Sequence, residues 1–443
     1  MNSEHTSQPD CQRSLALQKR FHQIIPGGGH TYAKGDDQFP EFMPVLIARG
    51  HGSHVWDEDG NEFIEYGSGL RSVTLGHAFE PVLEAVRRQL PLGSNFVRPT
   101  RIELECSEAL QAMVPCAEMV KFAKHGSDAL NAAVKLARAF TGRSQVAICG
   151  DHPFYSVDDW FIGTTPMSAG IPRAIADLTL RFRYNDLGDL QALFEQHPGG
   201  IAAVILEAER DKVPAANYLT ELKRLCQRHG AVLVFDEMIT GFRWHNGGAQ
   251  TFHGVTPDLA AFGKALANGF SVSALAGRRD IMRLGGLEHD RERVFLLSTT
   301  HGAETHALAA ALATMHTYLA HPVIERLWQQ GRRLAQGVSQ AAAEAGVTGQ
   351  FRVAGRECCL LYATLDANGQ SSQAFRTLFL QELMKRGILA PSFVVGWAHS
   401  DGDIDRTVEA VAAALQIYRR ALEDGVERHL LGRPVKPVFR RYN

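Results

Sequence analysis

The middle of the chain alternates short β-rich runs with helical segments, and no other feature of the sequence restricts the fold as strongly. The runs Val146–Cys149, Ala203–Leu206 and Ala231–Phe235 are apolar, and each is followed by glycine or an acidic residue. Strands that alternate with helices form a mainly parallel sheet covered by helices. We therefore expect an α/β fold, with its chemistry at the carboxyl ends of the strands, where ligands collect in open parallel sheets.

The alternation is confined to one part of the chain. Residues 1–75 are polar and Gly-rich at first and then predict a β-hairpin, with the turn at Glu58–Asn61. Residues 76–305 predict the large domain that carries the parallel sheet. Residues 306–443 predict a smaller C-terminal α+β lobe.

Three segments of the C-terminal lobe lead to separate expectations. Glu357–Tyr362 is apolar and predicts a strand, and Asp403–Glu423 predicts a final amphipathic helix. The basic, Pro-containing stretch Leu430–Arg441 forms a tail that is either docked or flexible, and no chemical role follows from its residues.

Composition narrows the class of partner. The 443 residues carry a formal net charge of −2, so no basic field attracts nucleic acid or anionic lipid. No apolar stretch approaches the ~20 residues that span a bilayer, and Met1–Ser14 lacks the apolar core of a secretory signal. We expect a cytoplasmic protein with a small-molecule partner and without a nucleic-acid or membrane partner. The seven cysteines form no CxxC pair and are expected to be reduced packing residues.

The strongest local signal is the acidic pair Asp236-Glu237, which follows the strand Ala231–Phe235 directly. A carboxylate at the end of an apolar strand must be solvated, paired or used, because an isolated buried charge is very costly. Taken alone, the pair could equally cap the next helix or turn.

A lone lysine, Lys264, follows a second apolar run, Leu259–Phe262. Desolvation lowers the pKa of a lysine in such a setting and supplies the neutral amine that Schiff-base chemistry needs. The alternative without a chemical role is a surface lysine whose aliphatic chain covers apolar neighbours. Gly263-Lys264 is not the end of a phosphate-binding P-loop, because the upstream glycine is missing and Ala265 replaces the Ser or Thr.

A third element is Gly126-Ser127, which precedes a run with apolar residues at helical spacing. The first amides of a helix and the positive end of its dipole bind phosphate. An ordinary N-cap explains the same residues when they are considered alone.

Together, these elements and their order resemble the class III (fold type I) PLP-dependent aminotransferases, and within them most closely the glutamate-1-semialdehyde 2,1-aminomutase group. The resemblance extends from about residue 20 to about residue 420. The matching stretches are Ile25–Gly28, Leu75–His77, Leu136–Arg143, Phe235–Met238, Thr240–Arg243, Pro257–Leu259, Gly263-Lys264 and Gly277–Met282.

The resemblance implies a pyridoxal 5'-phosphate (PLP) enzyme. Lys264 would carry the cofactor as a Schiff base and move the proton at the substrate carbon, and Asp236 would pair with the pyridine nitrogen. Gly126 and Ser127 would bind the phosphate. Thr300 matches a threonine that, in this family, completes the phosphate site of the neighbouring subunit, so the resemblance implies a homodimer with shared active sites.

Two further cofactor contacts follow from the resemblance. The family usually shows Tyr-His-Gly after the strand that corresponds to Val146–Cys149, whereas this chain reads Gly150-Asp151-His152-Pro153-Phe154-Tyr155. Phe154 is our first choice for the residue that stacks on the cofactor ring, and His152 is the second. Glu207 matches a Glu-Pro position near the ring, although Ala208 follows it here.

The substrate positions depart from the aminomutases. Lys34 stands where that group has an arginine for the substrate carboxylate, and lysine cannot make the planar bidentate contact. The segment Gly67–Arg71 lacks the group's pocket tryptophan, and Arg71 could recognise an acidic group or form a structural ion pair. These changes argue for a different substrate.

We therefore expect an aminotransferase that moves an amino group from a donor to a ketone or aldehyde through a pyridoxamine phosphate intermediate. The alternative is a glutamate-1-semialdehyde 2,1-aminomutase, which makes 5-aminolevulinate by intramolecular transfer. A PLP-binding sensor or structural subunit without catalysis is a remote third reading.

Other classes of enzyme fit the sequence poorly. A dinucleotide-dependent oxidoreductase is disfavoured because Gly67–Ser72 lacks the third glycine of the fingerprint. A metal hydrolase is disfavoured because neither His51 with His54 nor His301 with His306 has metal-site spacing and a matching acid. A Gly-x-Ser-x-Gly elbow is missing as well.

Overall fold

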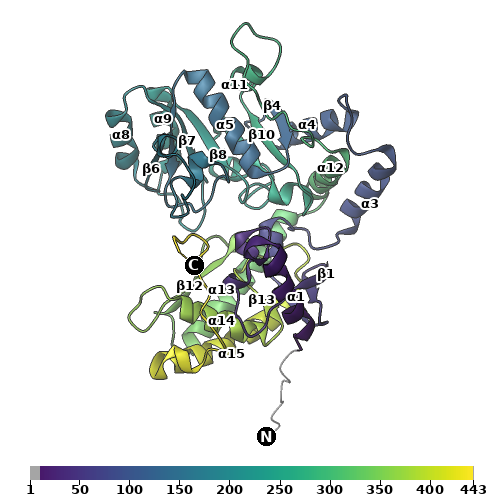
Figure 1. Ribbon diagram of the computed structural model, residues 1–443, viewed down its shortest axis with the longest axis vertical. Helices are drawn as coiled ribbons and strands as arrows, with labels where there is room; N and C mark the ends of the chain where they lie inside the picture. Colours follow the sequence, from purple (N-terminus) through teal and green to yellow (C-terminus); the bar gives the residue numbers. More distant parts are fainter. Residues whose placement is uncertain (1–9, 443) are drawn as a thin grey trace. The chain divides into compact units, whose positions relative to one another are not determined.

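The computed structural model describes residues 10–442, which divide into two compact units (Figure 1). Unit 1 contains the described part of Met1–Ser68 together with Thr74–Ala78 and Arg326–Arg440. Unit 2 contains Gly69–Val73, Phe79–Glu325 and the described part of Arg441–Asn443. The N-terminal segment and most of the C-terminal lobe, which lie far apart in the sequence, therefore share one unit.

Unit 2 is built on a seven-stranded, mainly parallel sheet with the order β4-β10-β9-β8-β7-β5-β6. The strands from β9 to β6 are parallel to their neighbours, whereas β10 is antiparallel to both β4 and β9. The expected strands and the expected α/β fold are confirmed. The strands are β4 (Met119–Ala123), β5 (Gln145–Cys149), β6 (Thr179–Phe182), β7 (Ile201–Leu206), β8 (Val232–Asp236), β9 (Leu259–Phe262) and β10 (Ser273–Gly277).

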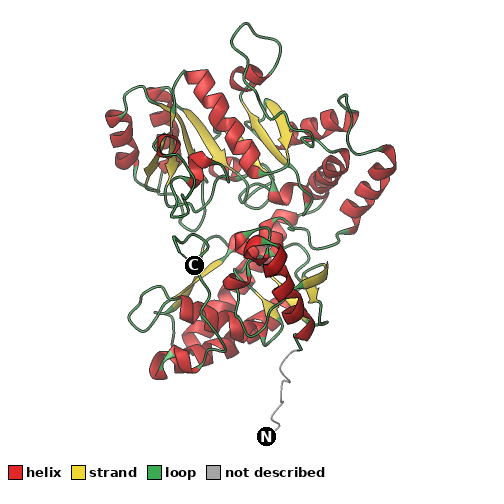
Figure 2. Ribbon diagram, in the orientation of Figure 1, coloured by secondary structure: helices red, strands yellow, loops and turns green. Residues whose placement is uncertain are grey.

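Helices flank the strands of unit 2 (Figure 2). Helix α5 (Gly126–Thr141) packs along β4, β7, β8, β9 and β10, and it runs in front of the sheet in Figure 1. Leu130, Ala133 and Ala137 on its apolar face are fully buried, as their helical spacing predicts. The other helices of five or more residues in unit 2 are α3 (Glu80–Gln89), α4 (Arg101–Met113), α8 (Leu187–Gln196), α9 (Tyr218–His229), α10 (Ala249–His253) and α12 (Thr305–Ala320).

Unit 1 contains the predicted hairpin. Strand β2 (His54–Asp57) pairs antiparallel with β3 (Glu62–Glu65), and β13 (Ile388–Leu389) adds to β3 in parallel. Val55 and Phe63 of the hairpin share a core cluster with Met384 and Leu389, which explains why the two ends of the chain form one unit. The remaining strands and principal helices are β1 (Ile47–His51), β11 (Phe351–Ala354), β12 (Leu361–Thr364), α1 (Gln12–Ile24), α13 (Val323–Glu344), α14 (Gln373–Met384) and α15 (Asp401–Asp424), where α13 starts at the end of unit 2.

The strand predicted at Glu357–Tyr362 needs a correction. Residues Glu357–Cys359 form a 3₁₀ turn, closed by the Cys359 amide on the Arg356 carbonyl at 2.8 Å, and β12 begins only at Leu361. Gly331 of α13 lies against the carbonyl of Glu357, where a Cβ atom would stand only 1.7 Å from the oxygen. The close approach of α13 holds Glu357–Cys359 in a turn, although the segment is apolar.

The C-terminal tail is docked on unit 1. The Val435 amide donates to Thr377 Oγ1 at 2.8 Å, and the Val435 side chain is 3% exposed. The Leu431 amide donates to Gln381 Oε1 at 2.8 Å, and Arg440 forms an ion pair with Asp37 at 2.6 Å. Of the two alternatives for the tail, docking is confirmed.

Two expectations from composition concerned the state of the cysteines and the presence of membrane-spanning segments. All seven cysteines are free, and all except the half-buried Cys11 are buried. Within residues 10–442, no single helix is long and apolar enough to cross a membrane, although the bent pair α12 and α13 would be by length and composition alone.

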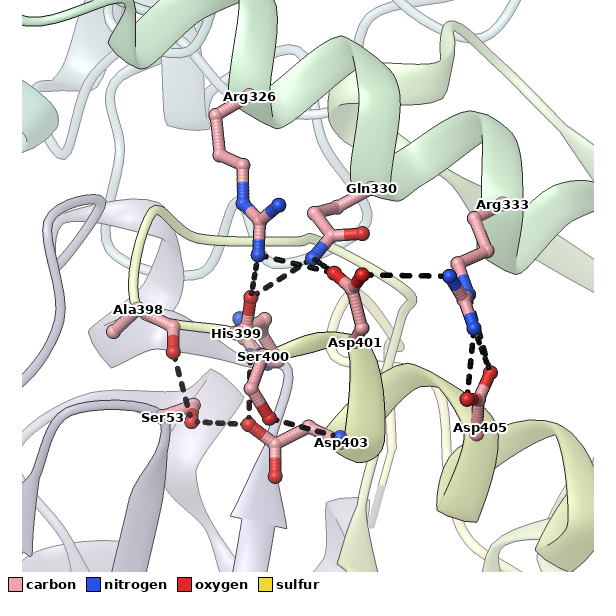
Figure 3. Close-up of polar contacts among 10 residues, drawn as sticks. All are labelled: Ser53, Arg326, Gln330, Arg333, Ala398, His399, Ser400, Asp401, Asp403 and Asp405. Atoms are coloured by element: carbon pink, nitrogen blue, oxygen red, sulfur yellow. Dashed lines mark hydrogen bonds and ion pairs between the residues drawn. The ribbon is translucent and has the colours of Figure 1, made fainter.

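A polar cluster in unit 1 fixes the start of α15 (Figure 3). The Ser400 amide donates to Asp403 Oδ2 at 2.9 Å, the Asp403 amide donates to Ser400 Oγ at 3.1 Å, and Ser53 Oγ donates to the same carboxylate at 3.0 Å. Gln330 of α13, which is 1% exposed, donates to Asp401 Oδ1 at 2.8 Å. This capping box satisfies the free amides of the helix and joins α15 to the β1–β2 turn.

Replacement of Asp403 by alanine should destabilise unit 1 by about 1–3 kcal/mol, because the buried Ser53 hydroxyl and the part-buried donors of His54 and Ser400 lose their acceptor. Burial alone would raise the pKa of Asp403, but hydrogen bonds from Ser400, Ser53 and His54 lower it. The stabilisation is therefore present above the unfolded pKa of about 3.9 and is lost as the pH falls through the lower folded pKa. Urea unfolding and hydrogen exchange of the Ser400–Thr407 amides measure the effect.

The matched control is Asp405→Ala, which removes an exposed partner of Arg333 and should change little. A difference between Asp403→Ala and wild type that persists undiminished at pH 3 would contradict the assignment.

Candidate active site

The candidate site lies at one edge of the unit 2 sheet, where three neighbouring parallel strands end. Glu207 follows β7, Asp236 is the last residue of β8, and Lys264 comes two residues after β9. β8 lies between β7 and β9, and Asp236 pairs with Ala261 of β9. Strand β10 is antiparallel to both β4 and β9, so β4 runs in the same direction as β9. The end of β4, which precedes Gly126, therefore lies at the same edge.

Asp236 is buried, with 4% of its surface exposed. Its Oδ1 accepts a hydrogen bond from the Met238 amide at 2.9 Å, whereas Oδ2 has no hydrogen-bond partner among residues 10–442. Burial, followed by the nearby Glu207 carboxylate, raises the pKa of Asp236 to about 7, against the opposing charge of Lys264. Oδ2 is therefore available to a group that carries positive charge or a proton.

Lys264 opens a short 3₁₀ turn, Lys264–Ala267, with its backbone at φ +46°, a conformation that is unusual for a residue with a side chain. Its side chain makes no hydrogen bond within the described part of the chain. Burial lowers the pKa of the Lys264 amine, although the carboxylates of Asp236 and Glu207 act in the opposite direction. The net shift is toward the neutral amine, which is the nucleophilic form of a lysine.

Glu207 is the third charged group at this edge. Its Oε1 accepts a hydrogen bond from Arg210 Nη1 at 2.7 Å, and its Oε2 is buried without a hydrogen-bond partner in the described residues. Burial alone would raise the pKa of Glu207, but the positive charges around it, Arg210 first, outweigh burial and lower the pKa. We did not predict Arg210 from the sequence, although its position three residues after Glu207 was the available signal.

The acidic pair divides into two different roles. Glu237 is fully buried and accepts hydrogen bonds from the Ala249 amide at 2.8 Å, the Gln250 amide at 2.9 Å and the Thr240 hydroxyl. It therefore satisfies the first amides of α10. The capping explanation holds for Glu237, whereas Asp236 faces the site.

Gly126 and Ser127 begin α5, as expected. Neither amide donates a hydrogen bond to another atom of the described chain. Ser127 Oγ accepts from the Val157 amide at 3.1 Å, which attaches the loop after β5 to the helix start. A helix N-terminus with free amides is a site for an anion such as phosphate.

Met238 joins these elements, and it was not among the residues that we predicted for the site. A Cβ atom built on Gly126 would lie 2.7 Å from Met238 Sδ, and a Cβ atom on Gly263 would also lie 2.7 Å from it. The Met238 side chain, 6% exposed, therefore packs between the start of α5 and the residue before Lys264.

The loop after β5 supplies the two candidates for ring stacking. His152 is 5% exposed, and its Nδ1 accepts from the Glu207 amide at 3.2 Å and contacts the Tyr155 hydroxyl at 3.1 Å. Burial lowers the pKa of His152, which favours its neutral form. Phe154 is 42% exposed, and its ring meets Phe161 edge-on at 5.6 Å between centroids.

The remaining predicted residues lie in different places. Arg71 is partly buried in unit 2, and its carbonyl accepts from Arg243 Nη2 at 3.1 Å. Thr300 is exposed, and its carbonyl accepts from Asn95 Nδ2 at 3.1 Å, so contacts within this chain do not connect it to Lys264. Lys34 belongs to unit 1 and is exposed on the 3₁₀ turn Tyr32–Lys34.

Known proteins share this architecture. Glutamate-1-semialdehyde 2,1-aminomutase of Desulforamulus reducens is 34% identical over 441 residues, which cover 94% of this chain and all of the relative. An omega-transaminase of Sphaerobacter thermophilus is 29% identical, with a TM-score of 0.83 over 93% of this chain and 98% of that one. The FumI protein of Sphingopyxis sp. MTA144, in its PLP internal aldimine form, is 26% identical, with a TM-score of 0.85 over 93% and 97% of the two chains.

The family model for class III aminotransferases matches residues 32–415. That range includes every residue at the sheet edge described above and all of the predicted cofactor contacts. The expected fold type and the expected cofactor are therefore confirmed. This chain is an enzyme that belongs to the class III aminotransferase family, which uses pyridoxal 5'-phosphate.

Proposed function

We propose that the enzyme is an aminotransferase that moves an amino group from a small-molecule donor to a ketone or aldehyde acceptor. The observation that carries the proposal is geometric: Lys264 and Asp236 lie at the ends of the neighbouring strands β9 and β8, and neither the Lys264 amine nor Asp236 Oδ2 has a hydrogen-bond partner in the described residues. These are the two groups that a pyridoxal phosphate site requires.

The residues at the sheet edge fit this cofactor. Asp236 Oδ2 is free to accept from a protonated ring nitrogen, and the amides of Gly126 and Ser127 are free to hold a phosphate. Both anchors lie at the same edge as the Lys264 amine. Glu207 Oε2 is buried and has no hydrogen-bond partner among residues 10–442, so it offers a further polar contact next to the ring.

Each residue then has a defined task. When bound, the cofactor would supply electron withdrawal from the carbon that bears the amino group. The Asp236 carboxylate would hold the ring nitrogen in its protonated form, which requires that the carboxylate itself be ionised. The Lys264 amine would hold the cofactor and would move the proton at the substrate carbon.

Phe154 is our proposed stacking residue. About two-fifths of its surface is exposed, which leaves a ring face available. His152, in contrast, is buried, and its Nδ1 already accepts a hydrogen bond from the Glu207 amide. His152 more naturally positions the backbone of Glu207. An aromatic face packed on a planar ring also restricts the ring's orientation.

We favour an aminotransferase over an aminomutase because the substrate positions differ from those of the aminomutases. Lys34 replaces the carboxylate-binding arginine, and Gly69-Leu70 lies where the pocket tryptophan is missing. Relatives named aminomutase and structural neighbours named transaminase both lie at moderate identity, so the name of a relative does not decide between the two.

We propose a homodimer in which Thr300 completes the phosphate site of the partner. The segment beside Thr300 exposes large apolar side chains, with Val97 fully exposed and Leu92 70% exposed. Asn95 donates to the Thr300 carbonyl, and the Thr305 amide donates to the Ser94 carbonyl at 3.0 Å, which joins the two segments into one surface. An apolar surface of this kind favours association with another protein surface.

The seven free cysteines support a cytoplasmic location, where thiols stay reduced.

The function is tested by product analysis with and without an amino donor. With L-glutamate or L-alanine present, the wild type should produce the corresponding keto acid and should need that donor. Lys264→Ala should lower the rate by about 10²-fold or more, because both cofactor attachment and proton transfer are lost. Lys223→Ala on α9 is the matched control and should be fully active. Conversion of glutamate 1-semialdehyde to 5-aminolevulinate without a donor would establish the aminomutase instead.

Cofactor affinity should fall as the pH drops through about 7. The pKa of Asp236 is raised to about 7 in the protein without cofactor, so below that pH its carboxyl is protonated and no longer binds the ring nitrogen. One such proton weakens binding by roughly tenfold per pH unit. Fluorescence titration of PLP into the apoprotein between pH 5.5 and 8.5 measures this. Because the cofactor phosphate also titrates, Asp236→Asn serves as the reference; equal slopes for both proteins would refute the role of Asp236.

The shared site is tested by mixing subunits. A dimer of one Lys264→Ala subunit and one Thr300→Ala subunit should regain activity, because one of its two sites contains an intact lysine and the partner's intact threonine. Differently tagged subunits allow this mixed dimer to be purified and assayed against the two parent dimers. If Thr300 served its own subunit, both sites would be defective and activity would not recover.

Gly263→Ala should weaken PLP binding by roughly tenfold, because the new methyl group overlaps Met238 in a closely packed region. Gly263 has φ near 180°, so alanine fits its backbone and only the contact changes. The double variant Gly263→Ala/Met238→Ala should recover part of the affinity, and Gly188→Ala on α8 is the control. Failure of the double variant to improve on Gly263→Ala would exclude the Met238 contact as the cause.

A further inference from the structure

The segment around Arg71 has an unusual backbone. Ser68, Gly69, Leu70 and Arg71 have φ values of +46°, +56°, +59° and +71°, which form one left-handed turn. Three of these four residues carry side chains that disfavour this conformation. Strain of this kind persists only where the surrounding structure holds it, and it concentrates at functional sites.

The contacts that hold the turn come from the loops that follow Asp236 and Lys264. The fully buried Arg243 donates through Nη2 to the Arg71 carbonyl at 3.1 Å. Val73 packs on Gly269, where a Cβ atom would lie 3.2 Å from Val73 Cγ2, and Ser72 Oγ donates to the Gly69 carbonyl at 2.7 Å. Gly69–Val73 accordingly belongs to unit 2, although the chain on both sides of it belongs to unit 1.

The strained turn presents an uncompensated guanidinium. Arg71 forms no ion pair with the described residues, and its Nε is buried without a hydrogen-bond partner. Its positive charge contributes to the lowered pKa of the Lys264 amine, so it acts over the same site. Arg210, the other cation that acts on Lys264, already binds Glu207. A buried donor on a cation is costly unless it is paired, which makes Arg71 a receptor for an anion.

We infer that Arg71 binds a carboxylate of the substrate, and that the enzyme therefore selects amino donors or acceptors that carry one. The inference rests on the proposed function, in which Lys264 is the reacting amine. A single guanidinium matches the charge of one carboxylate, and its planar fork matches the two oxygens. The backbone anchor through Arg243 fixes where the carboxylate is held.

Carboxylate binding is measured directly by calorimetry on the PLP-loaded protein. The probes are acetate, propionate, succinate and glutarate, each compared with its amide. The wild type should bind at least one acid and not its amide, and Arg71→Gln should weaken that binding by about 10- to 100-fold, as expected for a lost hydrogen bond between charged groups. Arg71→Lys should lie between them, because lysine keeps the charge but loses the fork. The surface variant Arg88→Gln should behave as the wild type.

Arg71→Gly separates binding from folding. Glycine adopts φ +71° without strain, so this variant should keep or raise the melting temperature while losing carboxylate binding. A lower melting temperature with unchanged carboxylate binding would show that Arg71 is structural and would overturn the inference. Binding of none of the acids by the wild type would overturn it as well.

Different results would overturn the proposed function and the role of Arg71. Absence of bound cofactor absorbance from the wild type would defeat the proposed function. An intact cofactor spectrum in Arg71→Gln, together with unchanged acid binding, would defeat only the role of Arg71. A kinetic comparison of L-alanine with isopropylamine, which replaces the carboxylate by a methyl group, adds a second readout. Arg71→Gln should lower kcat/KM for L-alanine by at least about tenfold and leave that for isopropylamine unchanged.

Discussion

The packing of one side chain, Met238, between two glycines determines the geometry of the site. The Met238 amide donates a hydrogen bond to Asp236 Oδ1. The Met238 sulfur fills the space that a side chain on Gly126 or Gly263 would need. Three elements that are distant in the sequence thus meet at one buried atom: the end of β8, the start of α5 and the turn that carries Lys264. Since packed interiors tolerate little change in volume, the proposed ring anchor Asp236, the proposed phosphate site at Gly126 and the Lys264 amine are fixed relative to one another.

The same edge of the sheet holds charges that the chain does not fully pair. Asp236 and Glu207 each keep one oxygen without a hydrogen-bond partner in the described residues, and Lys264 and Arg71 keep cationic groups without ion pairs there. In an ordinary core such groups would destabilise the fold. Their concentration around one lysine is better explained by a ligand that carries both a protonated ring and an acidic group. Glu237, next to Asp236 and fully satisfied by α10, shows what a purely structural carboxylate looks like in this chain.

Much of this arrangement could be predicted from the sequence, because it depends on strand ends and helix starts. The apolar runs that end at Cys149, Leu206 and Phe235 predicted the strands, and the parallel order of those strands brings their following residues together. What the sequence could not provide were contacts set by tertiary packing. Met238 has no local signature, Arg210 is recognisable only once Glu207 is placed, and Glu357–Cys359 form a turn because a distant glycine of α13 approaches their backbone.

We propose that the Lys264 amine is the group that holds the cofactor. Borohydride reduction of the purified protein, followed by proteolysis and mass spectrometry of the peptides, tests it most directly. We expect a reduced pyridoxyl phosphate group on the peptide that contains Lys264 and on no other lysine. A modified lysine elsewhere in the chain, or no modified peptide from protein that carries the cofactor, would contradict it.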